Sequence, residues 1–154
     1  MDPYRTHFCS QLNIKNLDEK VTLSGWLHRK RDHGNLLFID LRDNYGITQC
    51  VLDSSHNDFD NISSISNESV LTIKGKVIKR SEDTINNKLP TGAIEIKIET
   101  LDVLSKSKSL PLPVNSDIEY SEEIRLKYRY LDLRREKIHN NIILRNKVIS
   151  SIRS

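Results

Sequence analysis

Five short runs rich in β-branched residues follow one another along the first two thirds of the chain, and they constrain its fold more than any other feature. The runs show partial period-two alternation, which is typical of strands that bury one face. They span residues 21–29, 36–42, 47–52, 70–79 and 93–104. Turn-forming residues at 32–35 and 44–46 separate the first three, and apolar residues at helical spacing lie in the polar stretch 53–68. This order predicts five strands with one short helix between the third and the fourth.

We expect an all-β barrel, a five-stranded OB-fold Greek-key barrel, because the number and order of the elements match that fold. Gly25 and Gly75 lie where such a barrel bends. A five-stranded open sheet and an SH3-like barrel have similar strand counts and remain alternatives. Trp26 is expected to pack into the barrel with its N–H satisfied. Cys9 and Cys50 have no CxxC partner and no nearby histidine pair, so we expect buried thiols and neither a disulfide nor a metal site.

The hairpin at residues 25–53 holds the strongest indication of function. Its second strand alternates, so that the aliphatic side chains share one face while Phe38 lies on the other with Asp40. A basic triplet at 29–31 stands just upstream. Taken alone, the ring is equally a surface aromatic that covers a neighbouring strand, and the triplet a solvated edge. Together they predict RNA binding, because single strands are held by rings that stack on bases and cations that follow the backbone.

Other polar residues on the predicted strands are weaker candidates. Lys74 and Lys76 share a face of the predicted fourth strand, and Lys79 and Arg80 follow them. Gln49 has an amide suited to recognising a base edge. Its parity alone, however, does not place that amide beside the aromatic ring.

Catalytic chemistry finds little support in the sequence. The five glycines are scattered, so no phosphate-cradling loop is expected. No serine has a GxSxG setting, and the five histidines lack metal-ligand spacing. Asp40 and Asp43 are interpreted as a surface residue and a turn residue. We therefore expect neither a catalytic residue nor a metal site within this chain.

The formal charge of +3 is unevenly distributed. Residues 1–120 carry 15 basic and 17 acidic side chains, whereas residues 121–154 carry 9 and 4. Nucleic-acid binding in the first part must therefore come from local patches. No apolar run approaches the ~20 residues that span a membrane, and the first residues lack the apolar stretch of a signal peptide. We expect a cytoplasmic protein with no membrane partner.

Serine, lysine and proline dominate residues 105–120, which we expect to form an extended linker after a barrel domain at residues 1–104. Ser121 is the expected N-cap of a helical region with acidic residues in its first turn. From Lys137 onward, apolar residues at helical spacing predict a helix that runs to the end. Because such a helix needs an apolar partner, we expect the chain to be the front part of a longer protein.

Two strings carry a resemblance to a known family. Gly25-Trp26 and the string 29–43 (RKRDHGNLLFIDLRD) resemble the anticodon-binding barrel of bacterial-type aspartyl-tRNA synthetases. The string 121–135 (SEEIRLKYRYLDLRR) resembles the hinge between that barrel and the catalytic domain in the same enzymes. Lysyl and asparaginyl enzymes share the barrel type but match less well. Residues 121–154 are accordingly expected to hold the hinge and the first helix of a class II catalytic domain.

The resemblance implies roles for individual residues. Phe38 corresponds to the aromatic that stacks on the central anticodon base, and Gln49 to the residue that recognises the edge of that base. Arg29 and Arg31 correspond to the basic cluster that contacts the anticodon loop. Three further positions fall where the family has residues facing the first and last anticodon bases: Arg80, Asn86 and Glu95.

Two departures from the family pattern stand out. Glu136 replaces the usual proline after the Arg-Arg pair, so the final helix is expected to start earlier. His33 stands in the turn where many members have leucine, and some members charge both tRNA-Asp and tRNA-Asn. We hypothesise that His33 relaxes discrimination at the third anticodon base; an ordinary turn histidine is the equal alternative.

The resemblance also implies what the parent protein does. Such enzymes join L-aspartate to tRNA-Asp, with tRNA-Asn as a second candidate here, using ATP and Mg2+. The barrel itself is expected to need no cofactor, and the catalytic motifs are expected beyond Ser154. We expect a homodimeric parent and a monomeric fragment. Two rival functions are a free-standing OB-fold module that binds single-stranded nucleic acid without catalysis, and a barrel used only for protein contacts.

Overall fold

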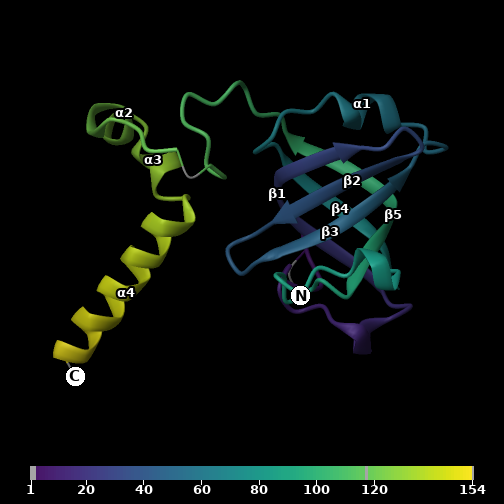
Figure 1. Cartoon of the computed structure of the whole chain (residues 1–154), viewed down its shortest axis with the longest axis horizontal. Helices are drawn as coiled ribbons and strands as arrows, with labels where there is room; N and C mark the ends of the chain where they lie inside the picture. Colours follow the sequence, from purple (N-terminus) through teal and green to yellow (C-terminus); the bar gives the residue numbers. More distant parts are fainter. Residues whose placement is uncertain (1–2, 117, 154) are drawn as a thin grey trace. The chain divides into compact units, whose positions relative to one another are not determined.

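The five predicted runs all form strands, and these close into a ring (Figure 1). The strands are β1 (Lys20–Asp32), β2 (Leu36–Arg42), β3 (Ile47–Asp53), β4 (Val70–Lys79) and β5 (Ile94–Ser105). Their order around the barrel is β1-β2-β3-β5-β4, and β4 pairs back onto β1. All neighbours are antiparallel except β3 and β5, which are parallel. The closed ring confirms the predicted barrel and excludes the open sheet.

The computed structural model describes residues 3–116 and 118–153. Contacts divide the chain into two units, Met1–Lys108 and Ser109–Ser154, which are treated separately below. The first unit contains the barrel, the 3-10 turns η1 (Ile14–Asn16) and η2 (Glu82–Thr84), and the helix α1 (Phe59–Ser63). The second contains α2 (Glu122–Lys127), α3 (Arg129–Asp132) and α4 (Glu136–Arg153).

Two glycines allow neighbouring strands to approach closely where the barrel bends. A Cβ at Gly25 would lie 2.3 Å from the carbonyl oxygen of Arg42, and one at Gly75 would lie 2.2 Å from that of Lys97. The pairing register of β4 with β5 shifts next to Gly75. Any side chain at these positions would therefore push two strands apart.

The barrel interior is filled by the side chains that the alternation assigned to one face. Leu37, Ile39 and Leu41 of β2 are at most 1% exposed, whereas the residues between them are half-buried. Helix α1 lies across one end of the barrel (Figure 1) and adds Ile62, which is 2% exposed. This confirms the predicted helix, although it is only one and a half turns long.

Both cysteines are free and buried, as predicted. Cys9 and Cys50 are each 0% exposed and belong to the barrel core. Burial raises the pKa of both thiols, because a thiolate there would lose its hydration. They therefore pack as small apolar side chains.

The second unit has a small core of its own. Leu112, Val114 and Leu131 are buried together, with Tyr128 packed against them. Ser121 occupies the predicted N-cap position of α2, but its side chain makes no capping hydrogen bond. The last helix begins at Glu136, one residue before the Lys137 from which a helix is predicted.

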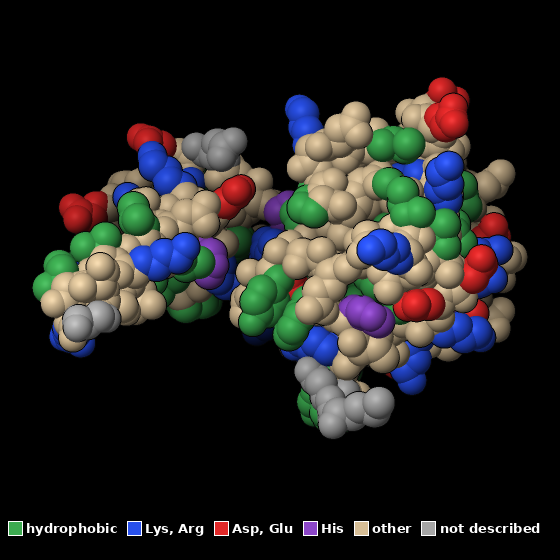
Figure 2. Space-filling model, turned by 90° about the horizontal axis from the view of Figure 1, so that it is seen from below, with side chains coloured by type: hydrophobic (Ala, Val, Ile, Leu, Met, Phe, Trp, Pro, Cys, Tyr) green, Lys and Arg blue, Asp and Glu red, His purple; other side chains and the backbone are tan. Residues whose placement is uncertain are grey.

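Helix α4 buries none of its residues within the described part of the chain. Its exposed apolar side chains include Leu144, Val148 and Ile152, and Figure 2 shows hydrophobic side chains gathered on this helix. No helix in the described part of the chain has the length and apolarity needed to cross a bilayer.

Candidate nucleic-acid interface

Strand pairing places most of the predicted RNA-binding residues on one outer face of the barrel. One row of paired residues runs from Arg31 on β1 through Phe38 and Val51 to Lys97 on β5. In the next row, Asp40 of β2 pairs with Gln49 of β3. Because directly paired residues point to the same side of a sheet, Gln49 lies on the same face as Phe38. The pairing register between β2 and β3 therefore places Gln49 beside Phe38, which alternation within a single strand could not do.

Phe38 projects from this face beside the turn that joins β1 to β2. The ring is half-buried, and the His33 imidazole meets it edge-on, with centroids 5.3 Å apart and planes at 87°. The turn is held by Gly34, which has a φ of +78°, and by the Asp32 carboxylate, which accepts a hydrogen bond of 2.7 Å from the Gly34 N–H. His33 is thus brought against the ring that is predicted to stack on a base.

A continuous chain of polar contacts crosses the face next to Phe38. Arg31 Nη2 donates to Asp40 Oδ1 at 2.9 Å and to Gln49 Oε1 at 3.0 Å. Gln49 Nε2 donates in turn to Glu95 Oε2 at 2.8 Å. The chain therefore joins residues from β1, β2, β3 and β5, and Gln49 at its centre is 7% exposed.

Arg80 extends this chain toward the loop between β4 and β5. Its Nε donates to the carbonyl of Ile94 at 3.0 Å and lies 3.9 Å from Glu95 Oε2, while Nη1 donates to Thr84 at 3.3 Å. Burial lowers the pKa of Arg80, and the nearby Glu95 carboxylate opposes that effect. Arg80 Nη2 and Arg31 Nε are buried donors that have no hydrogen-bond acceptor within the described residues. Both atoms lie beneath the surface, so neither is exposed to a ligand in this arrangement.

Asn86 lies in that same loop, but its own bonds stay within it. Its N–H donates to the carbonyl of Gly92, and its Oδ1 accepts from the N–H of Lys88, both at 3.1 Å. A Cβ at Gly92 would lie 1.8 Å from the Asn86 carbonyl oxygen, so the loop needs glycine there. None of these bonds reaches the polar chain, so Asn86 lies outside it.

The basic triplet is divided among three environments. Arg29 is exposed and pairs with Asp40 in register. A register shift between Leu27 and Arg29 sets Lys30 opposite the core residue Ile39. The Lys30 ammonium consequently turns to α1, where it donates to the Ser63 carbonyl and, at 2.6 Å, to that of Ile65. The expectation that all three cations face RNA is therefore wrong for Lys30, whose pKa burial lowers.

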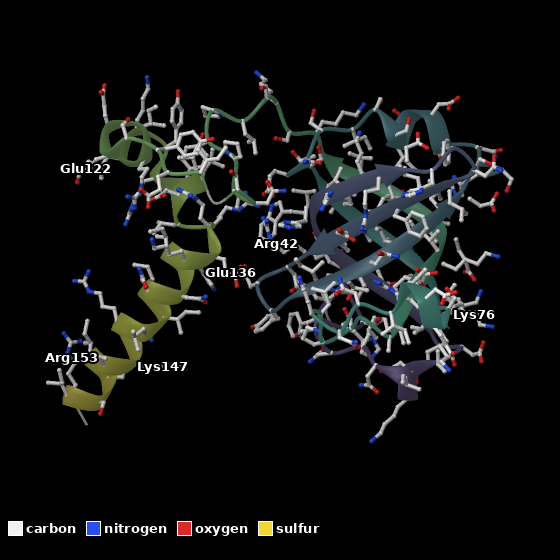
Figure 3. The ribbon with its side chains drawn as sticks, in the orientation of Figure 1. Arg42, Lys76, Glu122, Glu136, Lys147 and Arg153 are labelled. Atoms are coloured by element: carbon white, nitrogen blue, oxygen red, sulfur yellow. The ribbon has the colours of Figure 1, made fainter. Side chains whose placement is uncertain are left out.

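The cations on and after β4 are also divided between different environments: Lys74, Lys76, Lys79 and Arg80. Lys74 and Lys76 share a face as predicted, and Lys76 forms an ion pair of 2.7 Å with Asp18. Figure 3 shows Lys76 on the opposite side of the barrel from Arg42. Arg80 instead turns into the polar chain.

Trp26 does not pack into the barrel, contrary to expectation. It is half-buried on the outer face, because the residues flanking it in β1 point inward. The Arg42 guanidinium lies over its ring, 5.8 Å from the centroid. Arg42 also donates to Glu68 Oε2 and to His28 Nδ1, each at 2.9 Å. This group is called the Arg42 cluster below.

Asp40 is the member of the face that sequence reasoning missed. It was interpreted as a surface residue, yet its side chain is only 14% exposed and holds Arg31. Asp40 is two residues from Phe38 on β2, so alternation together with strand pairing indicates that both lie on the same face. Asp43, by contrast, is the predicted turn residue, accepting from the backbone N–H groups of Tyr45 and Gly46 at 2.8 and 3.0 Å.

The face is suited to binding. It combines a ring, an amide and two arginines, which is the set that stacks on bases and bonds their edges. No group of three or more potential metal ligands occurs among residues 3–116 and 118–153. In an OB barrel the strands 2–3 and the loops after strands 1 and 4 form the oligonucleotide-binding surface. Most of the candidate residues lie on these elements here, whereas Arg29 and Arg31 lie on β1 and Glu95 on β5.

Comparisons with known proteins give a consistent result. Residues 21–104 match the model of the OB-fold nucleic acid binding domain family, and residues 121–154 match that of class II tRNA synthetases (D, K and N). The chain is 61% identical over 154 residues to the aspartate–tRNA(Asp/Asn) ligase of Pelagibacter ubique and 56% identical over 153 residues to that of Phenylobacterium zucineum. These alignments cover 100% and 99% of the chain but only 26% of either relative.

A solved structure supports the same fold. Asparaginyl-tRNA synthetase from Pyrococcus horikoshii, complexed with asparaginyl-adenylate, matches with a TM-score of 0.81 at 25% identity, covering 96% of this chain and 33% of that one. The chain thus spans about a quarter of the length of the curated relatives it matches.

Proposed function

The chain belongs to the OB-fold nucleic acid binding domain family, and we propose that it binds the anticodon loop of a tRNA as the N-terminal part of an aspartate–tRNA ligase. The observation that carries the proposal is the outer face on which Phe38 lies beside Gln49 and the arginines Arg31 and Arg80. The unstacked bases of an RNA loop are recognised by that combination of stacking and edge hydrogen bonds.

Each residue has a role in this proposal. Phe38 stacks on the central anticodon base and Gln49 bonds its edge. Arg29 and Arg31 contact the backbone of the loop. The residues around the β4–β5 loop meet the first and last anticodon bases: Arg80, Asn86 and Glu95.

The proposal extends to the parent protein. The parent protein joins L-aspartate to tRNA-Asp with ATP and Mg2+, acts in the cytoplasm and is a homodimer. This chain supplies no residue to the chemical step. Residues 1–104 form the anticodon-binding domain, 105–120 the linker, and 121–154 the hinge and first helix of the catalytic domain.

Binding to an anticodon stem-loop tests the proposal. Phe38→Ala is expected to weaken binding of a stem-loop with the anticodon GUC by roughly 5- to 150-fold, since stacking on a ring is worth about 1–3 kcal/mol per base. Tyr45→Ala is the matched control, because Tyr45 is an exposed aromatic (62%) on the turn between β2 and β3. Equal affinities for the Phe38→Ala variant and the unmodified chain would refute the proposal. Equal affinity for any single strand would favour the free-standing module.

We also propose that His33 broadens the tRNA set to include tRNA-Asn. The relatives named above are aspartate–tRNA(Asp/Asn) ligases, and His33 touches the ring of Phe38. The anticodons GUC and GUU differ only at the third base. His33→Leu is expected to increase the preference for GUC over GUU stem-loops, and an unchanged preference would leave His33 as an ordinary turn residue.

A further inference from the structure

The carboxamide of Gln49 is held between opposite charges. Its oxygen accepts from Arg31 at 3.0 Å, and its nitrogen donates to Glu95 at 2.8 Å. A guanidinium only donates hydrogen bonds, and a carboxylate only accepts them. Turning the amide over would set its NH2 against the guanidinium and its oxygen against the carboxylate. The orientation of the amide is therefore fixed by its neighbours.

A fixed amide presents its donor and its acceptor in one order. The oxygen keeps a second lone pair and the nitrogen a second hydrogen, beyond the bonds to Arg31 and Glu95. Uracil and guanine carry a carbonyl acceptor next to a ring N–H, whereas cytosine and adenine carry an amino donor next to a ring acceptor. For a base held in one pose against Phe38, only one of these two orders matches the amide.

Asp40 holds the arginine that, together with Glu95, fixes this orientation. The same Nη2 of Arg31 donates to Asp40 Oδ1 at 2.9 Å and to Gln49 Oε1. The Arg31 side chain is 38% exposed and Asp40 only 14%, so the carboxylate is the anchored partner. Without Asp40, the long Arg31 side chain would be free to leave the amide for a phosphate.

We infer that Asp40 is a positioning residue for base specificity: through Arg31 it fixes the Gln49 amide, and the interface thereby selects a keto base, uracil or guanine, over an amino base, cytosine or adenine. The inference rests on the proposed binding of an RNA loop by this face. It adds a determinant that touches no base itself.

The test compares two stem-loops that differ only in the central anticodon base, uracil or cytosine, by fluorescence anisotropy on the full 154-residue chain. The unmodified chain is expected to prefer uracil by roughly 5- to 150-fold, the range for one well-made bidentate base contact. Asp40→Ala is expected to remove most of that preference, because an amide held by Glu95 alone is less firmly oriented. Asp40→Asn keeps an accepting oxygen without the charge, so its preference for uracil should lie between those of the unmodified chain and of Asp40→Ala.

Glu99→Gln is the matched control, since it also exchanges a carboxylate on the barrel but breaks only the exposed pair with Lys20. It should retain the full preference. Equal weakening of both loops by Asp40→Ala, or an unchanged ratio, would overturn the inference and leave Asp40 a structural residue. If Asp40→Ala lowers the melting temperature, the ratio measured for Asp40→Asn decides. Failure of the unmodified chain to bind either loop would instead refute the proposed function.

Discussion

The two ends of the outer face formed by β1 and β2 each contain an arginine, an acidic side chain and an aromatic ring, but in different arrangements. At one end, the Arg42 guanidinium lies over the Trp26 ring and bonds the Glu68 carboxylate. At the other, Arg31 bonds Asp40 and Gln49, while the ring of Phe38 is approached only by a histidine edge within the described residues. One aromatic ring is already covered by a cation, and the other is not.

The two ends also differ in how far their charges are buried. The side chains of Arg42 and Glu68 are 15% and 3% exposed, whereas those of Arg31 and Asp40 are 38% and 14% exposed. The Arg42 cluster is therefore a closed, structural group. The Phe38 face keeps an aromatic ring that no cation covers within the described residues. The presence of an arginine, an acid and a ring does not distinguish a binding surface from a structural cluster; the burial of the charges and the cover over the ring do.

Removing Arg42 should give the largest effect on stability and none on base preference. Arg42→Ala leaves the Glu68 carboxylate buried without its cation, a situation that costs about 3 kcal/mol in comparable pairs. Urea unfolding measures the loss. Lys20→Ala, which breaks the exposed pair with Glu99 (side chains 75% and 44% exposed), should change stability by no more than about 1 kcal/mol. Equal effects of the two variants would mean that the Arg42 cluster is not closed.

Lys30 tests whether the basic triplet is divided as the structure indicates. Lys30→Met keeps the apolar stem but removes the ammonium that bonds two carbonyls near the end of α1, and is expected to lower the free energy of unfolding by about 1–2 kcal/mol. RNA affinity and its salt dependence should not change. A weaker complex at unchanged stability would return Lys30 to the RNA-binding surface.

The fold was predictable because its signals are local. Alternation in the segment around Phe38 depends only on neighbouring residues, and it assigned the core and surface sides of β2 correctly. Short turns separate the first three strands, and Gly25 and Gly75 marked places where strands approach closely. Strand count and order then left few topologies to consider.

The site was less predictable because it depends on register between strands. Gln49 reaches the face of Phe38 through pairing with Asp40, which parity within one strand cannot express. The register shift after Leu27 sends Lys30 away from its two neighbours. Trp26 was assigned to the core by residue type, but its position in the alternation places it outside. Lys30 and Gln49 depend on a pairing between segments that are distant in sequence. The error at Trp26 has a different origin, because local alternation already placed it outside.

Arg29 should show a smaller effect, confined to RNA binding. It is exposed at the Phe38 end, and one phosphate contact to a single strand changes the slope of log affinity against log salt by about 0.7. Arg29→Ala is expected to reduce the slope by that amount and to leave base preference and stability unchanged. Lys74→Ala is the control, because Lys74 is also exposed but pairs with Thr22 and Thr100 on the other side of the barrel. An equal loss of slope for both variants would indicate general electrostatic attraction without a defined path.

The smallest expected effect is a pH dependence of stability that comes from His28 in the Arg42 cluster and not from the Phe38 face. Burial lowers the pKa of His28 below its ordinary value of 6.5, and the adjacent Arg42 acts in the same direction. The unfolded chain therefore takes up this proton at a higher pH than the folded chain does, so His28 makes stability fall as the pH drops below that ordinary value. His28→Asn retains an oxygen that accepts from Arg42 and cannot be protonated. Urea unfolding between about pH 7.5 and about pH 5 should show a smaller acid-induced loss of stability for this variant than for the unmodified chain, because the other titrating groups are common to both. Parallel losses would mean that His28 is free to protonate in the folded protein, and that the Arg42 cluster is as open to solvent as the face of Phe38.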